Sequence, residues 1–580
     1  MAKGKLMTRS PARGSGKKMV TADGLDHPIS LELCKRLNRF YEALILLSSL
    51  MQACSRNGQQ PNKAPSDVSE PGDNYRMTHE CLMNKLAQIC DNRRGGETVT
   101  SVAIIQLPDS LVYTFASNQR SPIEIKEAET FLLDLFEYLS HTSASSSVIM
   151  EDATSTQARH VLEKILAFNH ERVQCYRIGL AHGLTKCIED CDRCGSVHDI
   201  SVKQALLRLQ SVADSSTTSA GNISPSEKSS QDDEALVRAA ADLRQSVIFH
   251  SIVDRGKLGR FDESPHWAEL QHFIGRLVSY LRATQTIFVA RRRHPELFDT
   301  DSIKIKFITS SRPMPNPMNA FQAGLNTLQR QTVRSAHDII PRMTGDVGMI
   351  ETYSQYADEL QVCKLDELIA AQCCKSNPKG FRPIVHSEVL LLDWLRKQFA
   401  EDTHSIPFYE GNKYIGCSKP TCRLCEYYFA AHSSGVRVRS PHRNVYRNWA
   451  VPDALVEGDS SRYKDKMIDA VLAKVREDAL TALREKVCVR KRFDSNTYSS
   501  MPTCQSLTGI PDTLDDLSSR IGGLSISSHV HSRVHPSVVK SIPVSSNIED
   551  TRSVTAHEKN GGSDDESGGV LVFAGRNRRP

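Results

Sequence analysis

Four residues in the C-terminal half of the chain have types and spacing that suit metal chemistry. His386 and Glu388 are two positions apart, and Cys422 and Cys425 are three positions apart. Thiols at i and i+3 share one face of a helix, so one metal ion can bind both of them. A histidine and two cysteines hold zinc with one tetrahedral position left open to water, and a nearby carboxylate can then carry protons. The pattern predicts metal-assisted hydrolysis, with Glu388 as the proton carrier.

These residues must be positioned by two strand-to-helix junctions. Residues 382–385 and 413–416 are predicted as short strands. Each leads into a helix, the first over 388–395 and the second starting near Cys422. A helix N-terminus carries partial positive charge and unpaired N–H groups, which favour a thiolate over a thiol. We therefore expect two helix N-termini to converge on one zinc ion.

Cys417 complicates the ligand set, because it lies five residues before Cys422. Its thiol could replace one ligand, or it could add a fourth and close the site. Of these cysteines, only Cys422 and Cys425 have the i, i+3 spacing, so we assign them as the pair. We expect Cys417 to be a buried strand residue near the site.

Two stretches of the sequence resemble the nucleic-acid and nucleotide deaminase superfamily. They are 385–388, Val-His-Ser-Glu, and 414–425, which contains Gly-Cys-Ser-Lys before the cysteine pair. More narrowly, they resemble the branch with an Orientia prototype that is common in fungi. The resemblance covers about 340–455, and it implies that His386 and the cysteine pair bind zinc while the glutamate acts as acid and base in removing ammonia from a base.

The sequence departs from the family pattern at two positions. Ser387 stands where alanine is usual, and Thr421 separates Pro420 from Cys422. Neither change removes a ligand or the glutamate. The displaced proline is expected to affect substrate fit more than metal binding.

A later run, 440–449, also looks like a family element, with His442 and Trp449 as its most recognisable members. Together with Arg443, Tyr446 and Arg447, His442 is a candidate for contacts to phosphate or to a stacked base. The alternative is that this run is a basic and aromatic surface loop that packs on the domain.

Composition sets limits on the rest of the protein. A chain of 580 residues should hold two to four domains. The net charge of +5 is mild, so it neither demands nor repels a nucleic-acid partner. Sixteen cysteines without a secretory signal predict a reducing compartment, cytoplasmic or nuclear. The longest apolar run, 43–47, is too short to cross a membrane.

Polar segments divide the chain, and apolar residues at helical spacing fill most of the first half. We expect, in order, a disordered basic tail at 1–28, a mainly helical region at 29–212 with a linker at about 55–75, a disordered linker at 213–235, a helical region at 236–300, a zinc deaminase-like domain at 301–460, an amphipathic helix at 461–492 and a disordered tail at 493–580.

A second cluster of potential ligands lies in the helical half, where Cys187, Cys191, Cys194 and His198 fall within twelve residues. This spacing fits no standard zinc finger, and a helical context already explains buried cysteines. Structural zinc binding and simple burial both stay open here.

The sequence therefore predicts an α/β fold, a cytidine deaminase-like three-layer α/β/α domain with a mixed sheet, preceded by a mainly α-helical region. The expected function is Zn²⁺-dependent hydrolytic deamination of a base in a nucleotide or nucleic acid. The alternative is an inactive zinc-binding module of the same fold in a helical interaction protein, whose helices would bind protein partners. A third hypothesis, from the resemblance alone, is an effector that acts on foreign or host nucleic acid.

Overall fold

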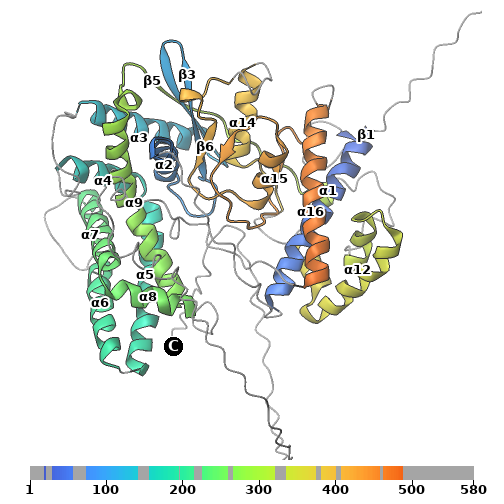
Figure 1. Ribbon diagram of the computed structural model, residues 1–580, viewed down its shortest axis with the longest axis horizontal. Coiled ribbons are helices and arrows are strands. Elements are labelled where there is room, and N and C mark those ends of the chain that lie inside the picture. The colour runs from blue at the N-terminus through green and yellow to red at the C-terminus, as the bar shows by residue number, and fades with distance from the viewer. Residues whose placement is uncertain are drawn as a thin grey trace, which may run out of the picture. The chain divides into compact units, whose positions relative to one another are not determined.

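The computed structural model of the chain describes residues 19–20, 29–56, 74–141, 156–194, 196–214, 225–258, 266–320, 335–373, 381–399, 406–457 and 461–486 (Figure 1). The expected tail at 493–580, most of that at 1–28 and most of the linker at 55–75 lie outside these residues. In the part of the chain that is described, no helix combines the length and the apolar character needed to cross a bilayer.

The centre of the fold is a mixed, five-stranded sheet with the order β5-β4-β3-β6-β7. Its strands are β3 (Thr100–Leu107), β4 (Ser110–Ser117), β5 (Ile303–Phe307), β6 (Tyr414–Cys417) and β7 (Arg437–Val438). Strand β3 pairs antiparallel with β4 and with β6, whereas the outer pairs β4–β5 and β6–β7 are parallel. The two central strands β3 and β4 thus come from the region that we expected to be mainly helical, outside 301–460.

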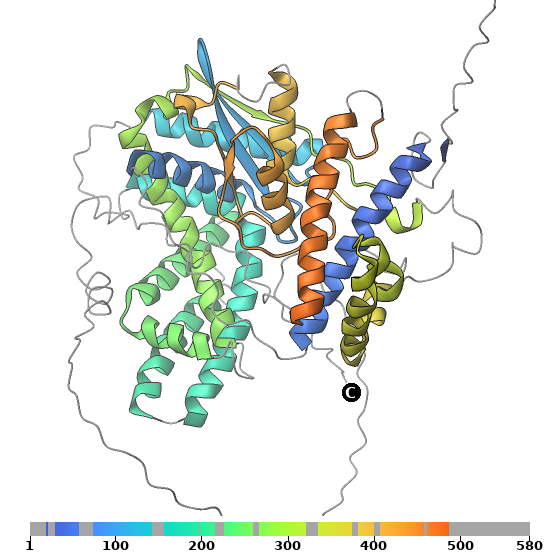
Figure 2. The same cartoon turned by 45° about the vertical axis from the view of Figure 1, so that its right-hand side comes forward.

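Helices cover both faces of the sheet, because its central strands bury both of their faces. Val102 and Ile104 of β3 pack with α2 (Asn74–Cys90) and α3 (Pro122–His141) in one hydrophobic cluster. Ala103 and Ile105 face a second cluster with α14 (Ser387–Gln398) and α15 (Arg423–Ala431). Figures 1 and 2 show these helix pairs on opposite sides of the strands. The predicted three-layer α/β/α fold with a mixed sheet is confirmed.

A helical region lies in the chain between β4 and β5, and its helices after α3 pack largely on one another. They are α4 (Thr156–Phe168), α5 (His170–Cys194), α6 (Val197–Asp214), α7 (Pro225–Gln245), α8 (Ile248–Leu258) and α9 (His266–Arg293). Helix α9 also packs on α2, which joins this region to the sheet layer. The expected mainly helical first half is confirmed.

Helix α7 begins at Pro225, inside the segment that we expected to be a disordered linker. Within this helix, the carboxylate of Asp233 is fully buried and accepts hydrogen bonds from Gln174 at 2.9 Å and Arg177 at 3.0 Å. Its second oxygen lies 2.7 Å from Nδ1 of His170. Ion pairing thus allows an acidic stretch to pack against α5.

A further group of helices packs beside α14 and α15. They are α1 (Leu31–Arg56), α10 (Pro317–Ala320), α11 (Ala336–Ile339), α12 (Val347–Glu359), α13 (Leu365–Cys373) and α16 (Ser461–Glu485). Helix α1 packs along α16 and against α13, and α16 also packs on α15. A short two-stranded sheet of β1 (Met19–Val20) and β2 (Ile29–Ser30) precedes α1. The amphipathic helix expected near 461–492 is therefore α16, which ends at Glu485.

Candidate active site

The two predicted helix starts converge. His386 is the N-cap residue of α14, and Cys422 is the N-cap residue of α15, where its Sγ accepts a hydrogen bond from the backbone N–H of Cys425 at 3.5 Å. Nδ1 of His386 lies 3.5 Å from Sγ of Cys422 and 3.4 Å from Sγ of Cys425. All three ligand atoms lie within 4.8 Å of one another, and of the residues that the structure describes these three form the candidate metal-binding group.

The spacing of these atoms fits a tetrahedral zinc ion. Zinc binds cysteine sulfur at about 2.3 Å and histidine nitrogen at about 2.0–2.1 Å, so tetrahedral geometry separates the two atoms by about 3.5 Å. The observed nitrogen–sulfur distances of 3.4 and 3.5 Å match that value. Two sulfur donors and one imidazole are also the ligand types that zinc prefers.

The segment that ends in Trp449 holds both ligand-bearing turns in place. On one side, Ile384 donates its backbone N–H to Asn448 at 3.0 Å, and Ala450 donates to Ile384 at 2.8 Å. On the other side, the N–H of His442 binds the carbonyl of Thr421 at 3.0 Å. Thr421, the extra residue between Pro420 and Cys422, thus forms a backbone bridge with the 441–442 segment. The predicted strand at 382–385 is reduced to a single bridge between Ile384 and the 448–450 backbone.

The proton-carrying candidate lies in the first turn of α14, where Glu388 is 3 % exposed. Burial raises the pKa of this carboxyl above its ordinary value, even though the nearby His386 opposes the shift. Burial also disfavours the charged forms of His386 and Cys422, so by itself it would lower the pKa of the histidine and raise the pKa of the cysteine. The pKa of His386 is nevertheless raised by the sulfur of Cys422, and in turn the pKa of Cys422 is lowered by its hydrogen bonds and by His386.

The start of α14 is fixed by residues that sequence analysis did not find. The backbone N–H of Ser387 donates to Oδ1 of Asn118 at 2.8 Å, and the Ser387 hydroxyl lies 2.8 Å from that of Ser101. Ser387 is fully buried, so the hydroxyl that replaces the usual alanine needs this partner. No sequence signal links Asn118 or Ser101 to the site, because 269 and 286 positions separate them from Ser387.

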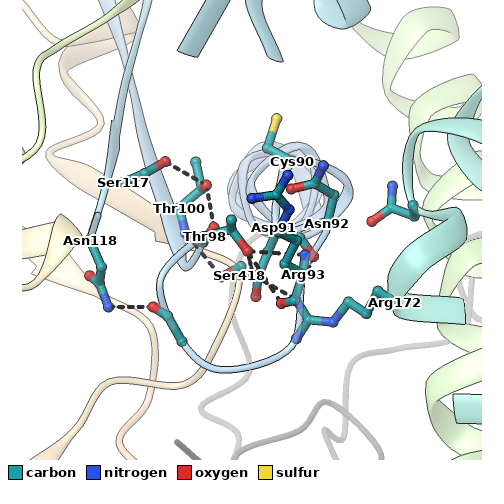
Figure 3. Close-up of polar contacts among 12 residues, drawn as sticks. Cys90, Asp91, Asn92, Arg93, Thr98, Thr100, Ser117, Asn118, Arg172 and Ser418 are labelled. Atoms are coloured by element: carbon teal, nitrogen blue, oxygen red, sulfur yellow. Dashed lines mark hydrogen bonds and ion pairs between the residues drawn. The ribbon is translucent and has the colours of Figure 1, made fainter. Parts of the chain in front are cut away.

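Asn118 also connects α14 to the loop between α2 and β3, as its Nδ2 donates to the carbonyl of Gly96 at 2.9 Å. Figure 3 shows how that loop is held. Thr98 donates to Oδ1 of Asp91 at 2.8 Å, and Arg172 of α5 forms an ion pair with the same oxygen at 2.5 Å. Arg172 also donates to the carbonyl of Arg93 at 3.0 Å. Arg172 of the helical region therefore restrains the loop between α2 and β3, and Asn118 links that loop to the start of α14.

The candidate substrate residues take different positions. The ring of Tyr446 lies 6.2 Å from the ring of His386. The buried ring of His442 packs edge-on against the ring of Tyr446, with the centroids 5.7 Å apart. Arg443 is exposed and adopts a left-handed φ of 61°. Arg447 is buried, donates to the carbonyl of Gln372 at 3.2 Å and lies over a phenylalanine ring. Tyr446 and Arg443 thus face the site or solvent, whereas Arg447 packs in the interior.

Cys417 lies at the end of β6 and is 2 % exposed. Its backbone N–H donates to Asn84 at 3.0 Å, and burial raises the pKa of its thiol to about 12. Among the described residues, the candidate metal-binding group consists of His386, Cys422 and Cys425 and does not include Cys417.

Of the second cysteine cluster, Cys187 and Cys191 are buried on α5, where Arg255 donates to Sγ of Cys191 at 3.7 Å. The side chains of Cys194 and His198 lie outside the described residues.

Comparison with known proteins agrees with this geometry. Residues 385–453 match the family model of the OTT_1508-like deaminases, and the match contains both ligand-bearing turns and Glu388. No curated protein and no solved structure matches the chain. The match supports the assignment of residues 385–453 as a deaminase-like domain of the Orientia-prototype branch of the deaminase superfamily.

Proposed function

We propose that this protein is a zinc-dependent hydrolytic deaminase that acts on a base of a nucleotide or nucleic acid. The observation that carries the proposal is the convergence of His386, Cys422 and Cys425, whose ligand atoms lie within 4.8 Å of one another beside the buried carboxylate of Glu388. The family match of this segment supports the class of reaction.

His386, Cys422 and Cys425 would hold the metal and leave one tetrahedral position open, which is typical of a catalytic zinc site. When bound, zinc would lower the pKa of a coordinated water from about 15.7 to roughly 7 and so supply the nucleophile. The helix N-termini at both cysteine and histidine turns favour the thiolates that such a site requires.

Glu388 would move the proton. It accepts a proton from the attacking water as oxygen adds to the ring carbon that carries the amino group. It passes that proton to the adjacent ring nitrogen and then carries the second proton of the added oxygen to the amino nitrogen, so that the carbon–nitrogen bond breaks and ammonia leaves with a carbonyl in its place. Burial suits Glu388 to this role, because its raised pKa brings the protonated form closer to neutral pH.

Two features support a nucleotide or nucleic acid as the substrate. The ring of Tyr446, 6.2 Å from that of His386, is placed to contact a planar base next to the metal. Arg443 is exposed on the same loop and suits a phosphate. The choice between cytosine and adenine depends on the pocket walls, so the assay must cover both.

The test is ammonia release, measured together with zinc content. The full chain is assayed on free nucleosides, nucleotides, single-stranded DNA and RNA, and compared with Glu388→Gln, which keeps the shape of the side chain. Glu367→Gln is the matched control, because its side chain is 71 % exposed on α13. Loss of a general acid–base group typically costs about 10²–10⁴-fold in rate.

We expect zinc in all three proteins, and ammonia from the parent and Glu367→Gln but not from Glu388→Gln. Ammonia release by Glu388→Gln at the parent rate would refute the role of the carboxylate. A parent without zinc, or one with zinc that releases no ammonia from any of these substrates, would contradict the proposed function.

A further inference from the structure

Trp449 contacts a candidate metal ligand directly. Its indole Nε1–H donates to Sγ of Cys425 at 3.2 Å, and the whole residue is fully buried. The sequence singled out this tryptophan only as a recognisable element, and the proposed reaction gives it no task. A buried indole N–H almost always has a hydrogen-bond partner, and here that partner is a sulfur atom of the site.

The orientation of the indole is fixed from several sides. The Tyr41 hydroxyl of α1 donates to the carbonyl of Trp449 at 3.2 Å. The rings of Phe40 and Tyr428 pack on Trp449 with centroids 6.0 and 6.3 Å away. The backbone on either side pairs with Ile384, two residues before His386. The residue thus binds one ligand through its side chain and restrains the segment that carries another.

An N–H donor matters to this site because the ligand set is electron-rich and buried. Two thiolates would balance the charge of Zn²⁺, and a neutral imidazole adds none. A hydroxide in the open position would then give the site one net negative charge. The Cys422 sulfur accepts a backbone N–H, and the Cys425 sulfur accepts the indole N–H. Both donors fix the orientation of a ligand sulfur without adding a formal charge to the interior.

We propose that Trp449 is a positioning residue of the metal centre, whose indole N–H holds the Cys425 sulfur in its ligating orientation and strengthens metal binding. The inference rests on the proposed metal site. Groups that bond to metal ligands typically change metal affinity by about 10–100-fold when they are removed. The same loss is expected here.

The experiment compares the full-length parent with Trp449→Phe, which keeps an aromatic ring but removes the donor. Trp267→Phe is the matched control, because Trp267 is also buried and donates its indole N–H, at 2.9 Å, to Asp190 in the helical region. Zinc affinity is measured by competition with a chelator, and the sulfur-to-metal charge-transfer band is recorded with Co²⁺. Both readouts are independent of catalysis.

We expect zinc binding to weaken about 10–100-fold in Trp449→Phe. The Co²⁺ band should move to lower energy, since a thiolate that has lost a hydrogen bond gives up its electrons more readily. Trp267→Phe should match the parent in both readouts. Equal affinity and an unchanged band in Trp449→Phe would overturn the inference, whereas a parent that binds neither metal would overturn the proposed function itself.

A second measurement does not require the variant to fold. The chain has three tryptophans, so selective ¹⁵N labelling gives three indole signals. Trp267→Phe and Trp394→Phe assign the third signal to Trp449 by elimination. We expect this signal alone to shift on addition of Zn²⁺, and an unmoved signal in a protein that has bound the metal would overturn the inference.

Discussion

The ion pair between Arg172 and Asp91 gives a sharp test of how the helical region supports the site. Arg172 comes from α5, and Asp91 follows the end of α2. Their side chains are 7 % and 3 % exposed. Arg172→Met removes the positive charge while keeping much of the apolar stem, so the buried carboxylate of Asp91 loses the cation that is paired with it (Figure 3).

The expected cost follows from the burial of both groups. Removing one partner of a buried ion pair typically destabilises a protein by about 3–5 kcal/mol, whereas breaking an exposed pair costs about 1 kcal/mol or less. Burial alone would raise the pKa of Asp91, but Arg172, with help from Lys419 and a hydrogen bond from Thr98, outweighs it and the pKa is lowered, so the carboxylate is charged at pH 7. With an unfolding entropy of about 2.1 cal/mol/K per residue over the described residues, Arg172→Met should therefore lower Tm by about 4–6 °C.

Thermal unfolding at pH 7 and hydrogen exchange of residues 91–99 measure the effect. Arg159→Met is the control, because Arg159 is 59 % exposed in its pair with Glu234 and the change should be nearly neutral. Adding Asp91→Asn to Arg172→Met should recover part of the loss, since no buried charge remains. The reasoning is refuted if Arg172→Met unfolds like Arg159→Met, or if the Asp91 and Arg172 changes are simply additive.

Further predictions concern close packing and pH. Gly416→Ala should destabilise the fold by about 1–3 kcal/mol, because the new Cβ would lie 2.6–2.7 Å from atoms of α2. In Gly183→Ala the nearest atom would lie 3.6 Å from the new Cβ, so this control should not lower Tm. Equal Tm values for Gly416→Ala and Gly183→Ala would contradict the prediction. Burial, aided by His294 and Arg437, lowers the pKa of His79 to about 4. The unfolded chain, with a histidine pKa near 6.5, then binds the extra proton, so stability should fall by up to about 3 kcal/mol from pH 6.5 to pH 4. His79→Gln should lack this part of the pH dependence of Tm, and an unchanged slope would refute it.

The ligand-bearing turns could be predicted because their signals are local. His386 and Cys422 fall at the helix starts where the sequence placed them, and the strand expected at 413–416 is β6, one residue later. Residues 303–307, Ile-Lys-Ile-Lys-Phe, alternate between apolar and basic side chains, and they form the edge strand β5. Each of these elements is predicted from a few consecutive residues, without any contact to a distant part of the chain.

The centre of the sheet could not be located in the same way. Six consecutive residues of β3, from Thr100 to Ile105, are buried, so the strand shows no alternation of apolar and polar residues. Its pairing with β6 joins residues as far apart as Thr100 and Ser418, which are 318 positions apart. The contact of Asn118 with Ser387 likewise joins residues 269 positions apart, so no local pattern contains it.

X-ray absorption at the zinc edge of the purified full-length chain would identify the atoms that bind the metal. We predict zinc with two sulfur neighbours at about 2.3 Å and two nitrogen or oxygen neighbours at about 2.0–2.1 Å, as expected for Cys422, Cys425, His386 and an open position filled by water. Protein without zinc would contradict the account. So would three sulfur neighbours, which would bring Cys417 into the ligand set and close the site.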